Sequence, residues 1–85
     1  MKVVAKPIDV VAWFDKDGIH PAKFRIEGKE GKTIVKIGKI VKKDMEKLAG
    51  NLMLVFTCES EINGQVKPYE IKYELNTMKW MLFKI

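Results

Sequence analysis

A tight turn at Asn63-Gly64 constrains this chain more than any other feature of the sequence. Both residue types tolerate the positive φ angles that a two-residue hairpin turn of type I′ requires. After the turn, apolar residues alternate with charged ones from Tyr69 to Leu75, which is the period of a strand with one buried face. The last run, from Met78 to Phe83, is apolar on both sides and predicts a strand that is covered on both faces.

Four further extended segments precede this hairpin, at 2–15, 19–27, 33–41 and 51–60. β-branched and aromatic residues dominate them, and short turns rich in Gly and Asp separate the first three. Gly38 inside the third segment predicts a bulge or a sharp bend. Residues 44–49 break the alternation and predict one or two helical turns, with Asp44 as the N-cap and Gly50 at the end.

These segments predict a mainly β fold for a single domain that spans residues 1–85. Six strands joined by short turns favour an antiparallel meander, with the one short helical turn near 44–49. Closing the sheet removes its vulnerable edges, so we expect a small SH3-like or OB-like barrel. The alternative is a flat sheet that pairs with a second copy of the chain.

The net charge of +5 is concentrated in one part of the chain. Residues 29–47 hold seven lysines and three acidic residues, so they supply four of the five excess charges. Arg25 is the single arginine among sixteen basic residues. Lysine is a point charge suited to loose attraction of phosphate, whereas arginine makes planar, bidentate contacts. The composition therefore argues against readout of base edges.

A basic stripe on this lysine-rich strand and loop is the main candidate site. Lys32 and Lys36 are in phase on one strand face, and Lys39 joins them if a bulge at Gly38 resets the alternation. Small barrels hold single-stranded nucleic acid on such a stripe beside exposed aromatic rings. The candidate nucleic-acid contacts are Lys32, Lys36, Lys39, Lys42 and Lys43, and the candidate stacking residues are Trp13, Phe14, Tyr69, Tyr73 and Trp80.

A structural interpretation of the same residues is equally simple. A domain this small needs most of its aromatic side chains for its own core. Lysines on the outer face of a strand also keep the protein soluble and discourage edge-to-edge aggregation. In the terminal hairpin, Lys72 between Glu70 and Glu74 is typical of a charge-balanced face in solvent.

No combination of residues in the sequence predicts catalysis, a cofactor or a metal. His20 could pair with Asp15 or Asp17, but a turn or strand-start residue that bonds the backbone explains it better. Cys58 lies on the apolar face of its strand with two glutamates just beyond it, which favours a buried structural thiol. One His and one Cys give no zinc spacing. The segment Gly28–Thr33 ends in Gly-Lys-Thr but lacks the longer glycine spacing of a phosphate loop.

Several short motifs resemble a family of small uncharacterised bacterial proteins, a domain of unknown function. The motifs are Pro21–Gly28 (P-x-x-F-x-x-x-G), the strand Val35–Gly38, Tyr69–Glu74 and Lys79–Leu82, and together they span roughly residues 20–85. Some members of that family occur beside genes for DNA-repair polymerases, so the resemblance implies a role near nucleic acid. It implies no catalytic residue.

The sequence thus predicts a non-enzymatic binding module whose partner is nucleic acid or a nucleoprotein complex. The alternative is a protein-interaction module, or a homodimer that pairs through sheet edges and exposed apolar strands. The lone cysteine favours a reducing compartment, which predicts a cytoplasmic protein. No apolar run approaches the length of a membrane span.

Overall fold

Seven β-strands form nearly the whole fold in the computed structural model, which describes residues 1–28 and 31–85. They are β1 (Val3–Asp15), β2 (Gly18–Gly28), β3 (Gly31–Lys36), β4 (Lys39–Leu48), β5 (Asn51–Ile62), β6 (Gln65–Glu74) and β7 (Lys79–Lys84). Neighbouring strands pair antiparallel in one sheet with the order β3-β2-β1-β7-β6-β5-β4. The prediction of a mainly β, antiparallel fold is confirmed, although the number of strands is seven and not six. Lys29, which belongs to the lysine-rich stretch, lies outside the described residues.

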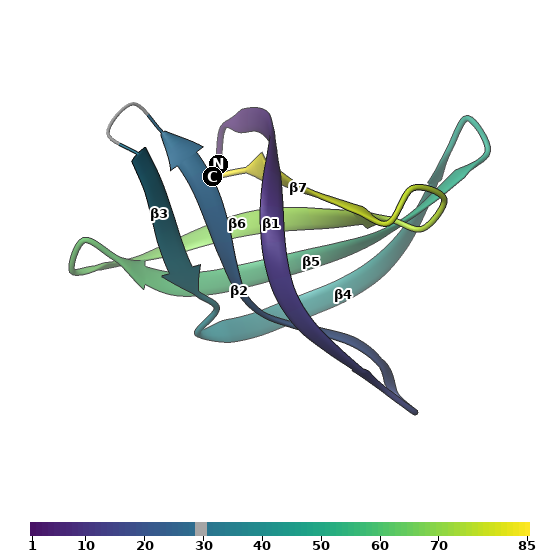
Figure 1. Ribbon diagram of the computed structural model, residues 1–85, viewed down its shortest axis with the longest axis horizontal. Helices are drawn as coiled ribbons and strands as arrows, with labels where there is room; N and C mark the ends of the chain where they lie inside the picture. The colour runs from purple at the N-terminus through teal and green to yellow at the C-terminus, as the bar shows by residue number, and fades with distance from the viewer. Residues whose placement is uncertain (29–30) are drawn as a thin grey trace.

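The sheet curls into a half-barrel with two layers. In Figure 1, β1 and β2 cross over β4, β5 and β6 at a steep angle. β7 pairs with β1 on one side and with β6 on the other, so it connects the β1–β3 layer to the β4–β6 layer. The two chain ends lie side by side: the Lys2 N–H donates to the Ile85 carbonyl at 2.8 Å, and the Ile85 N–H donates to the Lys2 carbonyl at 3.0 Å.

The extra strand arises because the segment predicted as one strand, 33–41, is two strands that meet at Gly38. The Gly38 N–H donates to the Glu59 carbonyl at 3.1 Å and to Ser60 Oγ at 3.3 Å. A Cβ at this position would lie 3.1 Å from the Glu59 carbonyl oxygen, which is closer than ordinary contact allows. The predicted sharp bend is therefore confirmed, and it carries the chain from one layer to the other.

The predicted helical turn at 44–49 is wrong, because these residues belong to β4 and its turn. Asp44 pairs with Val55 and Met45 pairs with Leu54 across the β4–β5 ladder. Ala49 and Gly50, with φ angles of 52° and 85°, form the tight turn that follows. A glycine with positive φ can end a helix or turn a hairpin, and the local pattern does not distinguish the two. Pairing with β5 decides it, since one or two helical turns are unstable alone.

The core lies between the two layers. Ile8, Phe24 and Val35 come from the β1–β3 layer, and the remaining buried side chains come from β5, β6 and β7: Leu54, Phe56, Cys58, Tyr69, Ile71, Tyr73 and Leu82. The Phe24 and Tyr69 rings meet edge to face across the layers, with their centroids 5.4 Å apart. The predicted turn at Asn63-Gly64 is confirmed by φ angles of 52° and 78°.

Lys72 departs from the prediction, because it is buried rather than solvated. Its side chain points to the outer face of β6 yet keeps only 7 % of its surface exposed. Its Nζ lies 3.2 Å from Glu46 Oε1 and 3.6 Å from the centroid of the Phe83 ring. The carboxylate pairs with the ammonium while the ring covers it, and these two contacts compensate for the loss of water around the side chain. Glu46 is not expected as the partner of Lys72 from the sequence, because the predicted helical turn at 44–49 does not place it beside β6.

Candidate nucleic-acid interface

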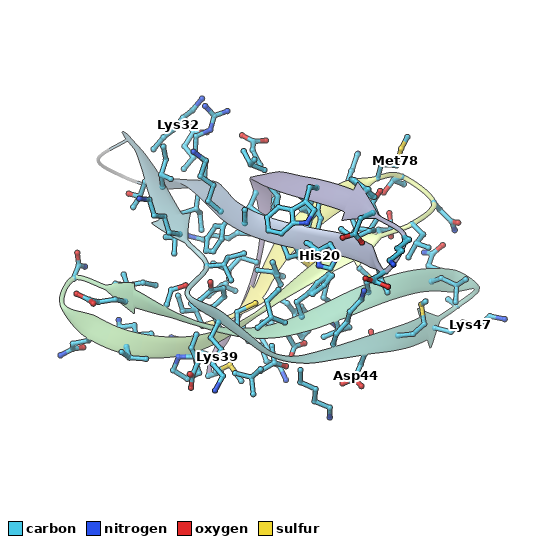
Figure 2. All side chains as sticks on the ribbon, turned by 90° about the horizontal axis from the view of Figure 1, so that it is seen from below. His20, Lys32, Lys39, Asp44, Lys47 and Met78 are labelled. Atoms are coloured by element: carbon cyan, nitrogen blue, oxygen red, sulfur yellow. The ribbon has the colours of Figure 1, made fainter. Side chains whose placement is uncertain are left out.

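The five candidate lysines do not form one stripe, because the chain changes layer between Lys36 and Lys39. Lys32 and Lys36 lie on the outer face of β3. Lys39 and Lys42 lie in the other layer, on β4, where they pair with Glu59 and Thr57 of β5. Figure 2 shows Lys32 well apart from Lys39, on opposite layers of the half-barrel.

Two of the five lysines are already engaged within the protein. Lys42 Nζ lies 3.3 Å from Asp44 Oδ2. Lys43 is in register with Phe56, and its Nζ lies 5.6 Å from the centroid of that ring on the inner side of the sheet. The Lys43 Nζ would also be 3.0 Å from a Cβ at Gly18, so it sits beneath the β1–β2 turn. These contacts leave Lys42 and Lys43 poorly placed to act together on one ligand.

The outer face of β1–β3 carries charge in three cross-strand rows. Glu27 lies opposite Lys32, and the Arg25 guanidinium donates to Asp9 Oδ2 from Nη2 at 2.8 Å and from Nε at 3.2 Å. Those two rows are balanced. In the third row Lys23 lies directly opposite Lys36, and neither has an ion-pair partner among the described residues. This row therefore has an excess of positive charge. Like charges that face each other across two strands destabilise the pairing, so a bound anion would relieve the repulsion.

Exposed apolar side chains surround the two lysines. Val11, which is in register with Lys23, is 57 % exposed, and Ile34 on β3 is 62 % exposed. Trp13 lies one row further along β1 and is 56 % exposed. A hollow of about 360 Å³ is lined by Asp9, Val10, Val11, Lys23, Phe24, Arg25 and Ile34. We call Val11, Trp13, Lys23, Ile34 and Lys36 the outer patch.

His20 and Asp15 hold Trp13 in place at the end of the patch. Trp13 is in register with His20, and the two rings stack with centroids 5.4 Å apart and planes 24° apart. His20 Nε2 lies 2.9 Å from Asp15 Oδ1, which also accepts from the Asp17 N–H at 2.8 Å. The hydrogen bond from His20 is the main cause that keeps the pKa of Asp15 below its ordinary value. His20 is near the start of β2 as predicted, but its partner is this carboxylate rather than the backbone.

The aromatic residues divide between core and surface. Tyr69 and Tyr73 are buried, and Trp80 packs against Tyr73 and Phe56 with centroid distances of 4.7 and 5.8 Å. Trp13 and Phe14 are the exposed members of the predicted stacking set.

Lys23 was missed as a site residue because its importance depends on the β2–β3 register. The exposed phase of Lys23, Arg25 and Glu27 was visible in the alternation of β2.

Cys58 is a buried thiol, as the sequence predicts. Burial raises the pKa of the Cys58 thiol from 9.0 to about 12, so the neutral thiol persists at ordinary pH. Within the part of the chain that the structure describes, no three His, Cys, Asp or Glu side chains gather into a group that could hold a metal ion. Residues 1–28 and 31–85 contain no helix long and apolar enough to cross a membrane.

Comparisons with known proteins leave the outer patch to be interpreted from its own chemistry. The chain matches no family model, no curated protein and no solved structure.

Proposed function

We propose that this protein is a non-enzymatic module that binds nucleic acid through the outer patch. The observation that carries the proposal is the pair Lys23 and Lys36, which face each other without an acidic partner among the described residues, beside the exposed Trp13 ring. A phosphate backbone supplies the negative charge that this row lacks, and its binding releases counterions. Lysine suits phosphate contacts that position a strand without reading its bases.

The proposal changes the set of lysines expected from the sequence. Lys36 remains central, and Lys23 joins it from the neighbouring strand. Lys32 lies opposite Glu27, and Lys39 lies opposite Glu59 on the other layer, so both contribute less. Lys42 belongs to an exposed ion pair with Asp44 and Lys43 covers the Phe56 ring, so neither is central to the proposal.

The test is the salt dependence of binding to labelled oligonucleotides. We expect Lys23→Glu/Lys36→Glu to abolish binding or weaken it strongly, and the neutral pair Lys23→Gln/Lys36→Gln to reduce the slope of log K against log salt by about 1.4 on a single strand. The control, Lys47→Glu/Lys67→Glu, makes the same change of net charge at two exposed lysines outside the outer patch. Equal loss in the control variant would show that net charge, and not the patch, drives binding. No binding by the natural protein at low salt would refute the proposal.

Free sheet edges favour a second candidate, a protein-interaction module. β4 runs for ten residues with one strand partner within the described part of the sheet, so a strand from another protein could pair with its open edge. A complex or dimer whose mass persists at high salt, without binding to nucleic acid, would support this candidate.

A further inference from the structure

We infer that the outer patch takes single-stranded DNA, with one base stacked on Trp13 and adjacent phosphates on Lys23 and Lys36. The inference rests on the proposed function and adds the form of the nucleic acid and the residue that distinguishes it.

Trp13 is built as a fixed platform for one flat ring. The His20 imidazole covers one face of the indole, and the Asp15 carboxylate holds that imidazole from the turn. Asp15 is itself fixed by the Asp17 N–H. Trp13 is 56 % exposed, so a ligand can reach the indole away from the imidazole. A ring supported in this way loses little conformational entropy when a base stacks on it.

The lysines lie within reach of a strand whose base occupies this platform. Val11 and Trp13 are two residues apart on β1, which is about 7 Å along the strand. Lys23 is opposite Val11, and Lys36 is opposite Lys23, so Lys36 lies about 10 Å across the sheet from Val11. A short run of backbone that crosses β1, β2 and β3 can therefore keep its base on Trp13 and its phosphates on the two lysines.

Stacking on Trp13 selects a single strand over a duplex. In a duplex both faces of each base are covered by its neighbours, and freeing one of them requires unstacking and unpairing. Single strands offer their bases without that cost, and stacking on an aromatic residue tolerates any sequence. A duplex would gain the phosphate contacts alone, so its affinity for the patch is expected to be lower.

The apolar part of the patch favours DNA over RNA. Val11 and Ile34 line the hollow together with Lys23, and the one carboxylate there, Asp9, is held by Arg25. Apart from the charged groups of Asp9, Lys23 and Arg25, the side chains that line the hollow are apolar. A 2′-hydroxyl placed on Val11 or Ile34 would lose water without gaining a hydrogen bond, which deoxyribose avoids.

The experiment compares four labelled probes of equal length on the full chain: thymidine oligonucleotide, the same backbone with abasic sites, uridine oligonucleotide and duplex DNA. The thymidine strand is expected to bind most tightly and to quench tryptophan fluorescence. Trp13→Ala is expected to weaken that binding by roughly 5- to 150-fold, the range seen when a base loses one aromatic partner. Trp13→Phe should restore most of the affinity. Thermal unfolding of each variant checks that the exposed ring is not needed for folding.

Each remaining outcome overturns a defined part of the inference. Equal affinity for the abasic strand, or no effect of Trp13→Ala, would remove the stacked base while leaving the phosphate-binding proposal standing. Equal affinity for duplex DNA would overturn the choice of a single strand, and equal affinity for the uridine strand would overturn the choice of DNA. Failure of all four probes to bind at low salt would refute the proposed function itself.

Discussion

Ser60 and Tyr69 bring two hydroxyl groups into the interior of a very small core. Both side chains are buried, and their oxygens lie 2.6 Å apart. The Gly38 N–H also reaches Ser60 Oγ, so this pair joins the bend between the layers to the centre of β6. Buried hydroxyl groups are tolerated when they satisfy each other, and each becomes costly when its partner is removed.

Tyr69→Phe is expected to lower the free energy of unfolding by about 1–2 kcal/mol, because it leaves the Ser60 hydroxyl with a weaker partner. Ser60→Ala should cost a similar amount. The double variant should cost clearly less than the sum, since removing both hydroxyls leaves neither unsatisfied. Urea unfolding of the four proteins measures this coupling. Strictly additive costs would show that the hydroxyl pair contributes nothing as a pair.

Burial of Cys58 and Tyr69 predicts a loss of stability at alkaline pH. Burial raises the pKa of Cys58 from 9.0 to about 12 and that of Tyr69 from 10.0 to about 12. Both neutral groups are favoured in the folded protein, so their contribution is complete below about pH 9. Above that pH unfolding releases protons, and stability falls until the folded groups ionise near pH 12.

Unfolding midpoints measured from neutral pH to pH 11 should therefore decrease beyond pH 9. Cys58→Ala should flatten the first part of the decrease, because it removes the group that ionises first in the unfolded chain. A decrease of the same shape in this variant would assign the effect to other groups.

At the scale of strands and turns, Gly38 determines where the sheet changes layer. Its N–H donates to the Glu59 carbonyl, and the same carbonyl oxygen blocks the space that a side chain would need. The bend is thus held by a contact of β5 with the β3–β4 connection, which is far away in sequence.

Gly38→Ala is expected to destabilise the protein by about 1–3 kcal/mol, because the neighbour that must yield is backbone and not a flexible side chain. Gly28→Ala is the matched control, since its Cβ would lie at 3.7 Å from the nearest atom outside its chain neighbours, in ordinary contact. Thermal unfolding of both variants gives the comparison. Equal stability of the two would mean that the bend adapts to a side chain.

The sequence predicts the strands well where local pattern decides them and poorly where distant pairing does. Asn63-Gly64 and the alternation from Tyr69 to Tyr73 follow from local geometry, and the structure confirms both. Residues 44–48 become strand because β5 offers them a partner, which no local propensity reveals. The candidate site behaves in the same way: Lys36 is visible from the sequence, whereas its opposition to Lys23 depends on the β2–β3 register.

Across the whole molecule, the two outer faces differ in how their charges are paired. On the β4–β6 layer, Lys72 pairs with Glu46 and Lys42 pairs with Asp44. On the β1–β3 layer, Lys23 and Lys36 add to each other instead. A polyanion that approaches the protein therefore meets one face with unbalanced positive charge and one face whose lysines are paired with carboxylates.

The open edge of β4 raises the question of self-association, and its charges argue against it. In a symmetric antiparallel pair of β4 strands, the twofold axis is perpendicular to the joined sheet. Both copies then turn the same face outward, and one residue lies opposite its own copy. When the axis passes through Lys42, Lys43, Asp44 or Glu46, that charged residue faces its own copy. When the axis passes through Met45, Lys43 of each copy faces Lys47 of the other. The natural protein is therefore expected to be a monomer, which sedimentation at low and high salt can measure.

Lys43→Met tests whether charge is what protects this edge. With residue 43 at the centre, Lys42 of each copy faces Asp44 of the other, and the substitution removes the repulsive pair at the centre of that register. The methionine can still pack on Phe56, which Lys43 now covers. We expect Lys43→Met to dimerise with rising concentration, while Lys67→Met, which makes the same change of charge on β6, stays monomeric. If the natural protein is itself a salt-resistant dimer, the edge is an interface, and the protein-interaction candidate replaces the nucleic-acid proposal.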